Sequence, residues 1–105
     1  MTTISVLYPR EAGATFDYAY YESTHLPLVK QHWTDAGLTG VSALRGVASG
    51  DGGESPFLAM AFLTFASMEA FQGALGGPHA ATIMGDIPNF TGVTPILQVN
   101  DTIAA

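Results

Sequence analysis

The stretch DYAYYESTHLPLVKQHW, residues 17–33, is the part of the chain from which the fold and the candidate site can be developed. It contains three of the four tyrosines, two of the three histidines, the only lysine and the only tryptophan. A segment that only packs a core seldom gathers so many aromatic side chains with a hydrogen-bonding group. We therefore interpret it as a helix that presents a mixed aromatic and imidazole face to a pocket.

The spacing within this stretch is helical. At about 100° per residue, one face collects Tyr18, Tyr21, His25, Val29 and His32. Pro27 interrupts the pattern, because it has no backbone N–H and its ring crowds the carbonyl of Ser23. We predict that the helix kinks or restarts near His25–Leu26, with Pro27 in the first turn of the second piece. Thr15 is the expected N-cap, and Gly37 is expected to close the element.

The remainder of the chain alternates between strand and helix signals. Short alternating or apolar runs predict strands at 3–8, 40–48, 57–65 and 91–99. Residues 57–65 are apolar on both faces, which indicates a central strand covered on both sides. Helical signals fall at 68–75, which Ser67 caps, and at 79–84. Pro95 marks the last strand as an edge or a bulge.

The order of elements predicts the fold class. A β-α-β-β-α-β order with one additional helical piece is that of an α+β, ferredoxin-like split βαβ fold, in which a four-stranded antiparallel sheet carries both helices on one face. Residues 1–105 then form a single domain. Nothing in the chain remains to cover the other sheet face, and only 11% of the residues are charged. We predict that a second subunit covers it, which gives a homodimer, the dimeric α+β barrel.

Charge and cysteine content exclude several classes of function. Three basic residues against nine acidic ones give a net charge of −6. The clustered Lys and Arg that bind phosphates are missing, so neither nucleic acid nor an anionic membrane surface is an expected partner. Without cysteine there is no disulfide or thiolate chemistry. No apolar run approaches the roughly 20 residues that span a bilayer, and no signal-type start is present, so we expect a cytoplasmic protein.

The segment YYESTHLPLV, residues 20–29, resembles the EthD family of small dimeric α+β barrel proteins. The pattern Tyr-Tyr-x-x-x-His-x-Pro-Leu is met by Tyr20, Tyr21, His25, Pro27 and Leu28. His79, followed by DIPNFT (86–91) and a final strand, is also similar to that family, so the likeness extends over essentially the whole chain. The resemblance implies a ligand between the helices and the sheet. Related barrels include cofactor-independent monooxygenases, muconolactone isomerases, polyketide cyclases and haem-degrading enzymes.

His25 and Tyr21 are the candidate catalytic residues. An imidazole titrates near neutral pH, so His25 suits a general base or acid, and the resemblance strengthens that interpretation. Tyr21, one turn away, would orient His25 or bind a ligand carbonyl. The structural alternative is that His25 bonds a carbonyl freed at the Pro27 break and that Tyr21 only packs.

Five further residues are expected to bind the substrate: Tyr20, Trp33, Phe62, His79 and Asp86. The structural alternatives are a core position for Trp33, a surface position for His79 and a capping role for Asp86. An aspartate near His79 would instead set the tautomer of that histidine.

No metal or cofactor is expected. His25 and His32 lie seven residues apart, about 10 Å along a helix, which is too far for one ion unless the kink closes them up. The alternative, by analogy with related barrels, is that His25 ligates a haem. Arg45, on a strand face, is most simply an ion-pair partner, but it would anchor an anionic group if it faced the cleft.

Two classes of function fit these features. One is an enzyme that isomerises, cyclises or oxygenates a small, largely apolar, oxygen-bearing metabolite without a cofactor, with His25 as acid or base. The other is a non-catalytic ligand-binding or accessory protein of a degradation pathway that uses an oxygenase. Both need an apolar pocket. They differ in whether His25 lies within hydrogen-bond reach of the ligand.

Overall fold

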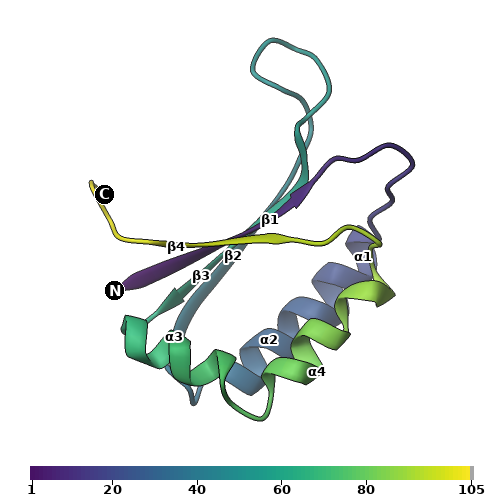
Figure 1. The fold of residues 1–105 in the computed structure, drawn as a ribbon. Coiled ribbons are helices and arrows are strands. Elements are labelled where there is room, and N and C mark those ends of the chain that lie inside the picture. Colours follow the sequence, from purple (N-terminus) through teal and green to yellow (C-terminus); the bar gives the residue numbers. More distant parts are fainter. Residues whose placement is uncertain (105) are drawn as a thin grey trace.

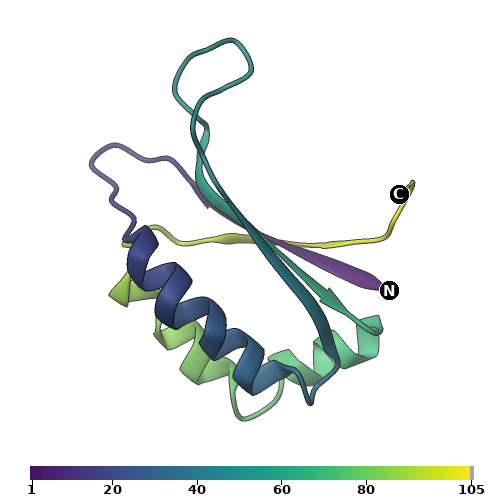
Figure 2. The same ribbon diagram turned by 180° about the vertical axis from the view of Figure 1, so that it is seen from behind.

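The computed structural model describes residues 1–104 of the chain. The four strands form one antiparallel sheet in the order β2-β3-β1-β4. Their bounds are β1 (Thr2–Pro9), β2 (Leu38–Arg45), β3 (Phe57–Phe65) and β4 (Ile96–Asn100). The helices all lie on one face of this sheet, as Figures 1 and 2 show from opposite sides. The predicted α+β, ferredoxin-like arrangement is confirmed.

Two helical crossings connect the strands. The first holds α1 (Tyr18–Tyr20), the π-helical turn η1 (Tyr21–His25) and α2 (Leu26–Trp33). The second holds α3 (Met68–Leu75), α4 (Ala80–Gly85) and the 3₁₀ turn η2 (Ile87–Asn89). Ser67 caps α3 as predicted, since its hydroxyl accepts a hydrogen bond from the Ala70 amide at 3.0 Å. In both views α2 and α4 lie side by side (Figures 1 and 2).

The first crossing passes Pro27 through a widened turn. The amide of Leu26 donates to the carbonyl of Tyr21, one residue farther back than in an α-helix. The α-helix restarts at Leu26 with Pro27 in its first turn, as the sequence predicts. The π turn contains one residue more than an α-helical turn. The side chains after it are therefore rotated about the helix axis relative to those before it. Trp33 packs into the core, whereas His32, which was predicted to share the face of Tyr21, is only half-buried.

Among the predicted element boundaries that are wrong, two share one reason. Asp17, and not Thr15, caps α1, because its carboxylate accepts a hydrogen bond from the Tyr20 amide at 3.0 Å. The chain just before it is extended, since Phe16 forms a β-bridge with Thr91. Thr91 therefore pairs outside the sheet, and the last strand begins at Ile96 instead of at residue 91.

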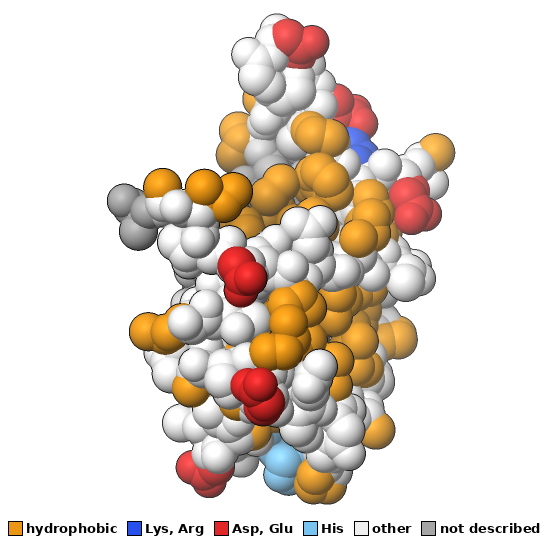
Figure 3. Space-filling view, turned by 60° about the vertical axis from the view of Figure 1, so that its left-hand side comes forward, with side chains coloured by type: hydrophobic (Ala, Val, Ile, Leu, Met, Phe, Trp, Pro, Cys, Tyr) orange, Lys and Arg blue, Asp and Glu red, His pale blue; other side chains and the backbone are white. Residues whose placement is uncertain are grey.

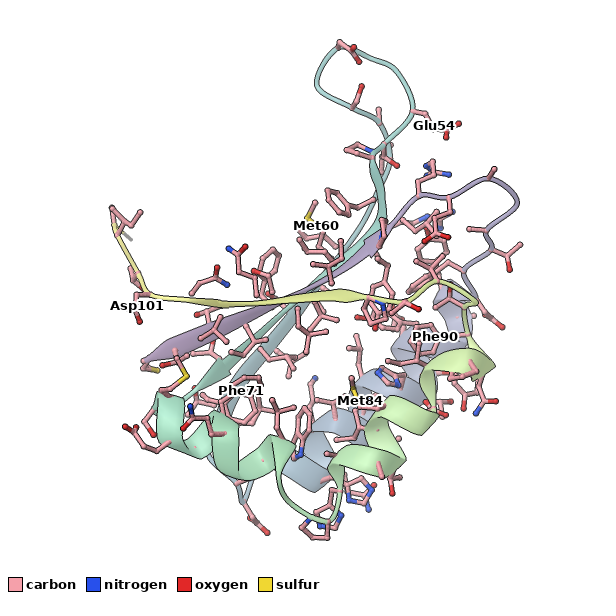
Figure 4. All side chains as sticks on the ribbon, viewed as in Figure 1. Glu54, Met60, Phe71, Met84, Phe90 and Asp101 are labelled. Atoms are coloured by element: carbon pink, nitrogen blue, oxygen red, sulfur yellow. The ribbon has the colours of Figure 1, made fainter. Side chains whose placement is uncertain are left out.

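The two faces of the sheet differ in what covers them. The inner face packs against the helices through a core that includes Ile4, Leu63 and Phe65. Met60 lies on the opposite side of the sheet from Phe71 and Met84, as Figure 4 shows. Within residues 1–104 no helix covers the outer face, so β3 is central as predicted but is covered on one side only by this part of the chain.

The turn between α2 and β2 needs a glycine. The helix itself is capped by Thr34, so Gly37 ends the following turn instead of capping the helix as predicted. Gly37 has φ +108°, a conformation that residues with a Cβ rarely adopt. A Cβ at this position would also lie 2.8 Å from the Cβ of Ala70 on α3. The close approach of this turn to α3 therefore depends on the missing side chain.

We expect Gly37→Ala to lower the free energy of unfolding by roughly 2–5 kcal/mol. Backbone strain at positive φ and overpacking against Ala70 would both destabilise the folded state. Gly13→Ala is the control, since Gly13 also has positive φ (+76°) but no atom within 4 Å of the added Cβ. It should lose only about 1–2 kcal/mol. Urea denaturation of both variants and of Gly37→Ala combined with Ala70→Gly measures these values. Equal losses for the two alanine variants, or no favourable coupling with Ala70→Gly, would contradict the clash.

Candidate functional site

A cavity of about 40 Å³ lies between the helices and the inner face of the sheet. The sheet contributes Ile4, Val6, Ala61 and Leu63 to its wall, and the first crossing contributes Tyr21, His25, Val29 and Trp33. Leu75, Met84 and Leu97 also line it and are 39–40% exposed, so the cavity opens between these side chains. The space-filling view shows hydrophobic side chains gathered around a hollow on one side of the molecule (Figure 3). Few polar groups face this space.

His25 is the polar residue on the cavity wall that carries chemistry. It ends the π turn and is 5% exposed. Its ring stacks on Tyr21 with centroids 5.6 Å apart and packs against Phe90 at 4.6 Å. Phe90 in turn contacts Tyr8, Phe16 and Tyr21, so the imidazole is held in a well-packed aromatic cluster.

Asp86 fixes the orientation of the His25 ring through a hydrogen bond with Nδ1. Its Oδ2 lies 2.9 Å from Nδ1 of His25. Its Oδ1 accepts hydrogen bonds from the hydroxyl of Tyr20 at 2.6 Å and from the amide of Asn89 at 2.9 Å. An ionised carboxylate only accepts hydrogen bonds, so the proton of neutral His25 resides on Nδ1 and Nε2 carries a free lone pair.

The charge state of the pair follows from its surroundings. Burial lowers the pKa of His25, although the hydrogen bond and the negative charge of Asp86 oppose the shift. Burial alone would raise the pKa of Asp86, but hydrogen bonds from Tyr20, Asn89 and His25 outweigh it and lower the pKa. At neutral pH the site therefore holds a neutral imidazole backed by a carboxylate.

Nε2 of His25 and two nearby phenol hydroxyls are without hydrogen-bond partners in residues 1–104. Nε2 of His25 makes no hydrogen bond within residues 1–104, and it is not completely enclosed. Nor do the hydroxyls of Tyr8 and Tyr21 bond to any group in that part of the chain. Burial raises the pKa of Tyr21 to about 12, and burial together with the nearby Tyr21 also raises the pKa of Tyr8. Both phenols stay protonated and can donate a hydrogen bond.

The structure brings together only some of the predicted site residues. His25, Tyr21 and Trp33 line the cavity, and Trp33 is also core, with an enclosed Nε1 that has no hydrogen-bond partner in residues 1–104. Asp86 belongs to the site through its bond to His25. Tyr20 is absent from the cavity wall and acts on it through Asp86.

Two predicted site residues lie elsewhere. Phe62 is on the outer face of the sheet, because strand alternation sends Ala61 and Leu63 to the cavity and Phe62 the other way. His79 is exposed and stacks on His32 with ring centroids 4.4 Å apart, away from the cavity lining. Asp86 therefore sets the tautomer of His25, and not that of His79.

Sequence reasoning missed Tyr8, Asn89 and Phe90. Tyr8 is nearly fully buried and lines the cavity, yet on the sequence it is only one position of an alternating strand. Asn89 and Phe90 lie in the DIPNFT segment, three and four residues after Asp86. This closeness in sequence to a predicted site residue could have identified them. Within residues 1–104, no three His, Asp or Glu side chains converge as metal ligands would. No helix there is long and apolar enough to cross a bilayer.

We expect Asp86→Asn to lower the pKa of His25 further, because the carboxylate's charge and hydrogen bond both favour the imidazolium. Titration of the His25 ring signals by NMR measures this shift. Asp35→Asn, which removes an exposed carboxylate beyond the end of α2, is the matched control and should leave His25 unchanged. An unchanged or higher pKa in Asp86→Asn would contradict the role of Asp86.

Comparison with known proteins shows the family to which the chain belongs. The chain is 35% identical to an EthD-like protein from Ralstonia eutropha JMP134, over 98% of this chain and 92% of that one, with a TM-score of 0.89. An ethyl tert-butyl ether d (ethd) family protein from Bacillus halodurans C-125 is 24% identical, over 98% and 99%, with a TM-score of 0.77. SnoaB, a cofactor-independent oxygenase from Streptomyces nogalater, is 14% identical, over 99% and 93%, with a TM-score of 0.67, and so shares the fold. No curated protein matches. Since the model of the EthD domain matches residues 11–94, the chain belongs to the EthD family.

Proposed function

We propose that the cavity binds a small, largely apolar metabolite that bears a carbonyl oxygen, and that Nε2 of His25 takes a proton from it. The observation that carries the proposal is the His25–Asp86 pair, with its free Nε2, on the wall of an otherwise apolar cavity. A neutral imidazole whose pKa lies below its usual range is deprotonated at neutral pH and available as a base.

The proposed reaction is proton transfer at a carbon next to the carbonyl. The C–H electron pair moves onto the substrate as an enolate, and the proton goes to Nε2. The resulting imidazolium is stabilised by the Asp86 carboxylate at 2.9 Å. The protonated hydroxyls of Tyr8 and Tyr21 supply hydrogen bonds for the enolate oxygen. Return of the proton to a different carbon isomerises the substrate and consumes no other reactant.

The size of the cavity limits how the ligand binds. A space of about 40 Å³ holds a water molecule but not a metabolite. Met84 and Leu75 lie at the opening of the cavity, and each is 40% exposed. Methionine has three rotatable bonds and adapts to irregular shapes, so we propose that displacement of these side chains enlarges the site around a ligand.

Deuterium exchange tests the proton transfer directly. We expect wild-type protein in D₂O to catalyse exchange at the α-carbon of at least one member of a panel of ketones and lactones. Replacing His25 by Ala or Asn should lower the exchange rate about 10²–10⁴-fold, as loss of a general base does. His79→Ala is the matched control, since this histidine lies outside the cavity. The acid limb of the pH–rate profile should have its midpoint below pH 6.5, because the pKa of His25 is lowered.

Two outcomes of that experiment would contradict proton transfer. One is exchange that persists unchanged in both His25 variants. The other is tight binding of panel members without any exchange, which would favour the role of an accessory, ligand-binding protein.

We further propose that the outer face of the sheet pairs with a second copy of the chain. The four strands contain one charged residue, Arg45, and it lies on the inner face beside Tyr18. The outer face carries Leu7, Leu44, Met60, Phe62 and Ile96, interspersed with serine and threonine. A face of this composition without charge suits burial against an identical surface.

We expect sedimentation velocity to show a dimer for the wild type and a monomer for Phe62→Glu, because two like charges would be buried in the paired faces. Val47→Glu makes the same change at a loop position that is 88% exposed, and it should remain dimeric. A monomeric wild type, or a dimeric Phe62→Glu protein, would refute the pairing of these faces.

A further inference from the structure

A second hollow lies on the other side of the wall formed by Tyr21 and Leu26. It is a surface groove of about 300 Å³ between the first crossing and the edge strand β2. Its lining consists of Tyr18, Tyr21, Glu22, Leu26, Ala43, Leu44, Arg45 and Ala59. Tyr21 and Leu26 line the inner cavity as well. Groove and cavity are therefore neighbours separated by these two side chains.

Arg45 gives this groove a fixed positive group. Its guanidinium carbon lies 4.2 Å from the centre of the Tyr18 ring. The ring is held in turn, because the Tyr18 hydroxyl donates a hydrogen bond to the carbonyl of Leu58 at 2.8 Å. A guanidinium that stacks on an aromatic ring keeps its N–H groups directed outward in one plane. Less side-chain entropy is then lost when it binds an oxyanion.

Arg45 also lacks a carboxylate partner. No Asp or Glu oxygen within residues 1–104 lies closer than 4.0 Å to it, although the chain has nine acidic residues and only three basic ones. Arg10, by contrast, hydrogen-bonds Ser55 and lies 3.4 Å from Glu54. Glu22 lines the same groove without pairing with Arg45, so the groove holds one positive and one negative group.

We propose that this groove is a subsite for the anionic end of the ligand, with Arg45 as the group that recognises it. The ligand class is an apolar molecule with a single negative charge, such as a carboxylate. Its body lies on Tyr21, Leu26 and Ala43, and its charged oxygens take bidentate hydrogen bonds from Arg45. Glu22 disfavours a second negative charge. This subsite deepens the proposed function and rests on it, because the same Tyr21 borders the cavity that holds His25.

Two dyes with the same aromatic body test the subsite. 8-Anilino-1-naphthalenesulfonate carries one negative charge, and N-phenyl-1-naphthylamine carries none. We expect fluorescence titration to show that Arg45→Gln weakens binding of the sulfonate about tenfold, the loss typical of one charge-assisted hydrogen bond. Binding of the neutral dye should change less than twofold. Lys30→Gln changes the net charge equally at an exposed position of α2 outside the groove and should affect neither dye.

The outcomes separate this subsite from the proposed proton transfer. Equal binding of both dyes, with no effect of Arg45→Gln, would refute the anion subsite while leaving the cavity proposal intact. Equal weakening of both dyes by Arg45→Gln would also refute it, because Arg45 would then support the groove and not the charge. Selective weakening of the sulfonate alongside failed deuterium exchange would support the subsite and refute catalysis by His25. Binding of neither dye to wild-type protein would overturn the subsite.

Discussion

The hydrogen bond between Asp86 and His25 is the interaction on which the site depends. It joins residues that are 61 positions apart, one at the end of the π turn and the other at the junction of α4 and η2. The same carboxylate binds Tyr20, so it connects both helical crossings at a single point. Because the carboxylate can only accept hydrogen bonds, it also determines which nitrogen of neutral His25 carries the proton.

Packing around this hydrogen bond determines the charge state of the His25 imidazole. Phe90 and Tyr21 enclose the ring, and the removal of water disfavours the imidazolium. The carboxylate opposes that effect without overcoming it. The balance leaves His25 neutral at neutral pH. In the proposed reaction, the Asp86 carboxylate would stabilise the imidazolium.

The cavity and the groove lie where small residues of the sheet face large residues of the helices. Ala61 and Ala59 on β3 leave room under Tyr21 and Leu26, and those two side chains divide that room into an inner cavity and an outer groove. Arg45 and His25 stand on opposite sides of this division. In the two proposals, the groove supplies the charged contact and the cavity supplies the proton acceptor.

The sequence by itself determined the order of the elements, the restart of the helix at Leu26 and the placement of Tyr21 and His25 on one face of the first crossing. Those features depend on neighbours within one turn or one strand, where spacing and the missing N–H of Pro27 decide the geometry. Alternation along β3 likewise separates Phe62 from Ala61, but it does not say which of the two faces the helices. Only the tertiary structure decided that Phe62 lies outside, that His79 pairs with His32, and that Asp86 bonds to His25. The reason is physical: these outcomes depend on how segments far apart in the chain pack together, and local periodicity carries no information about that.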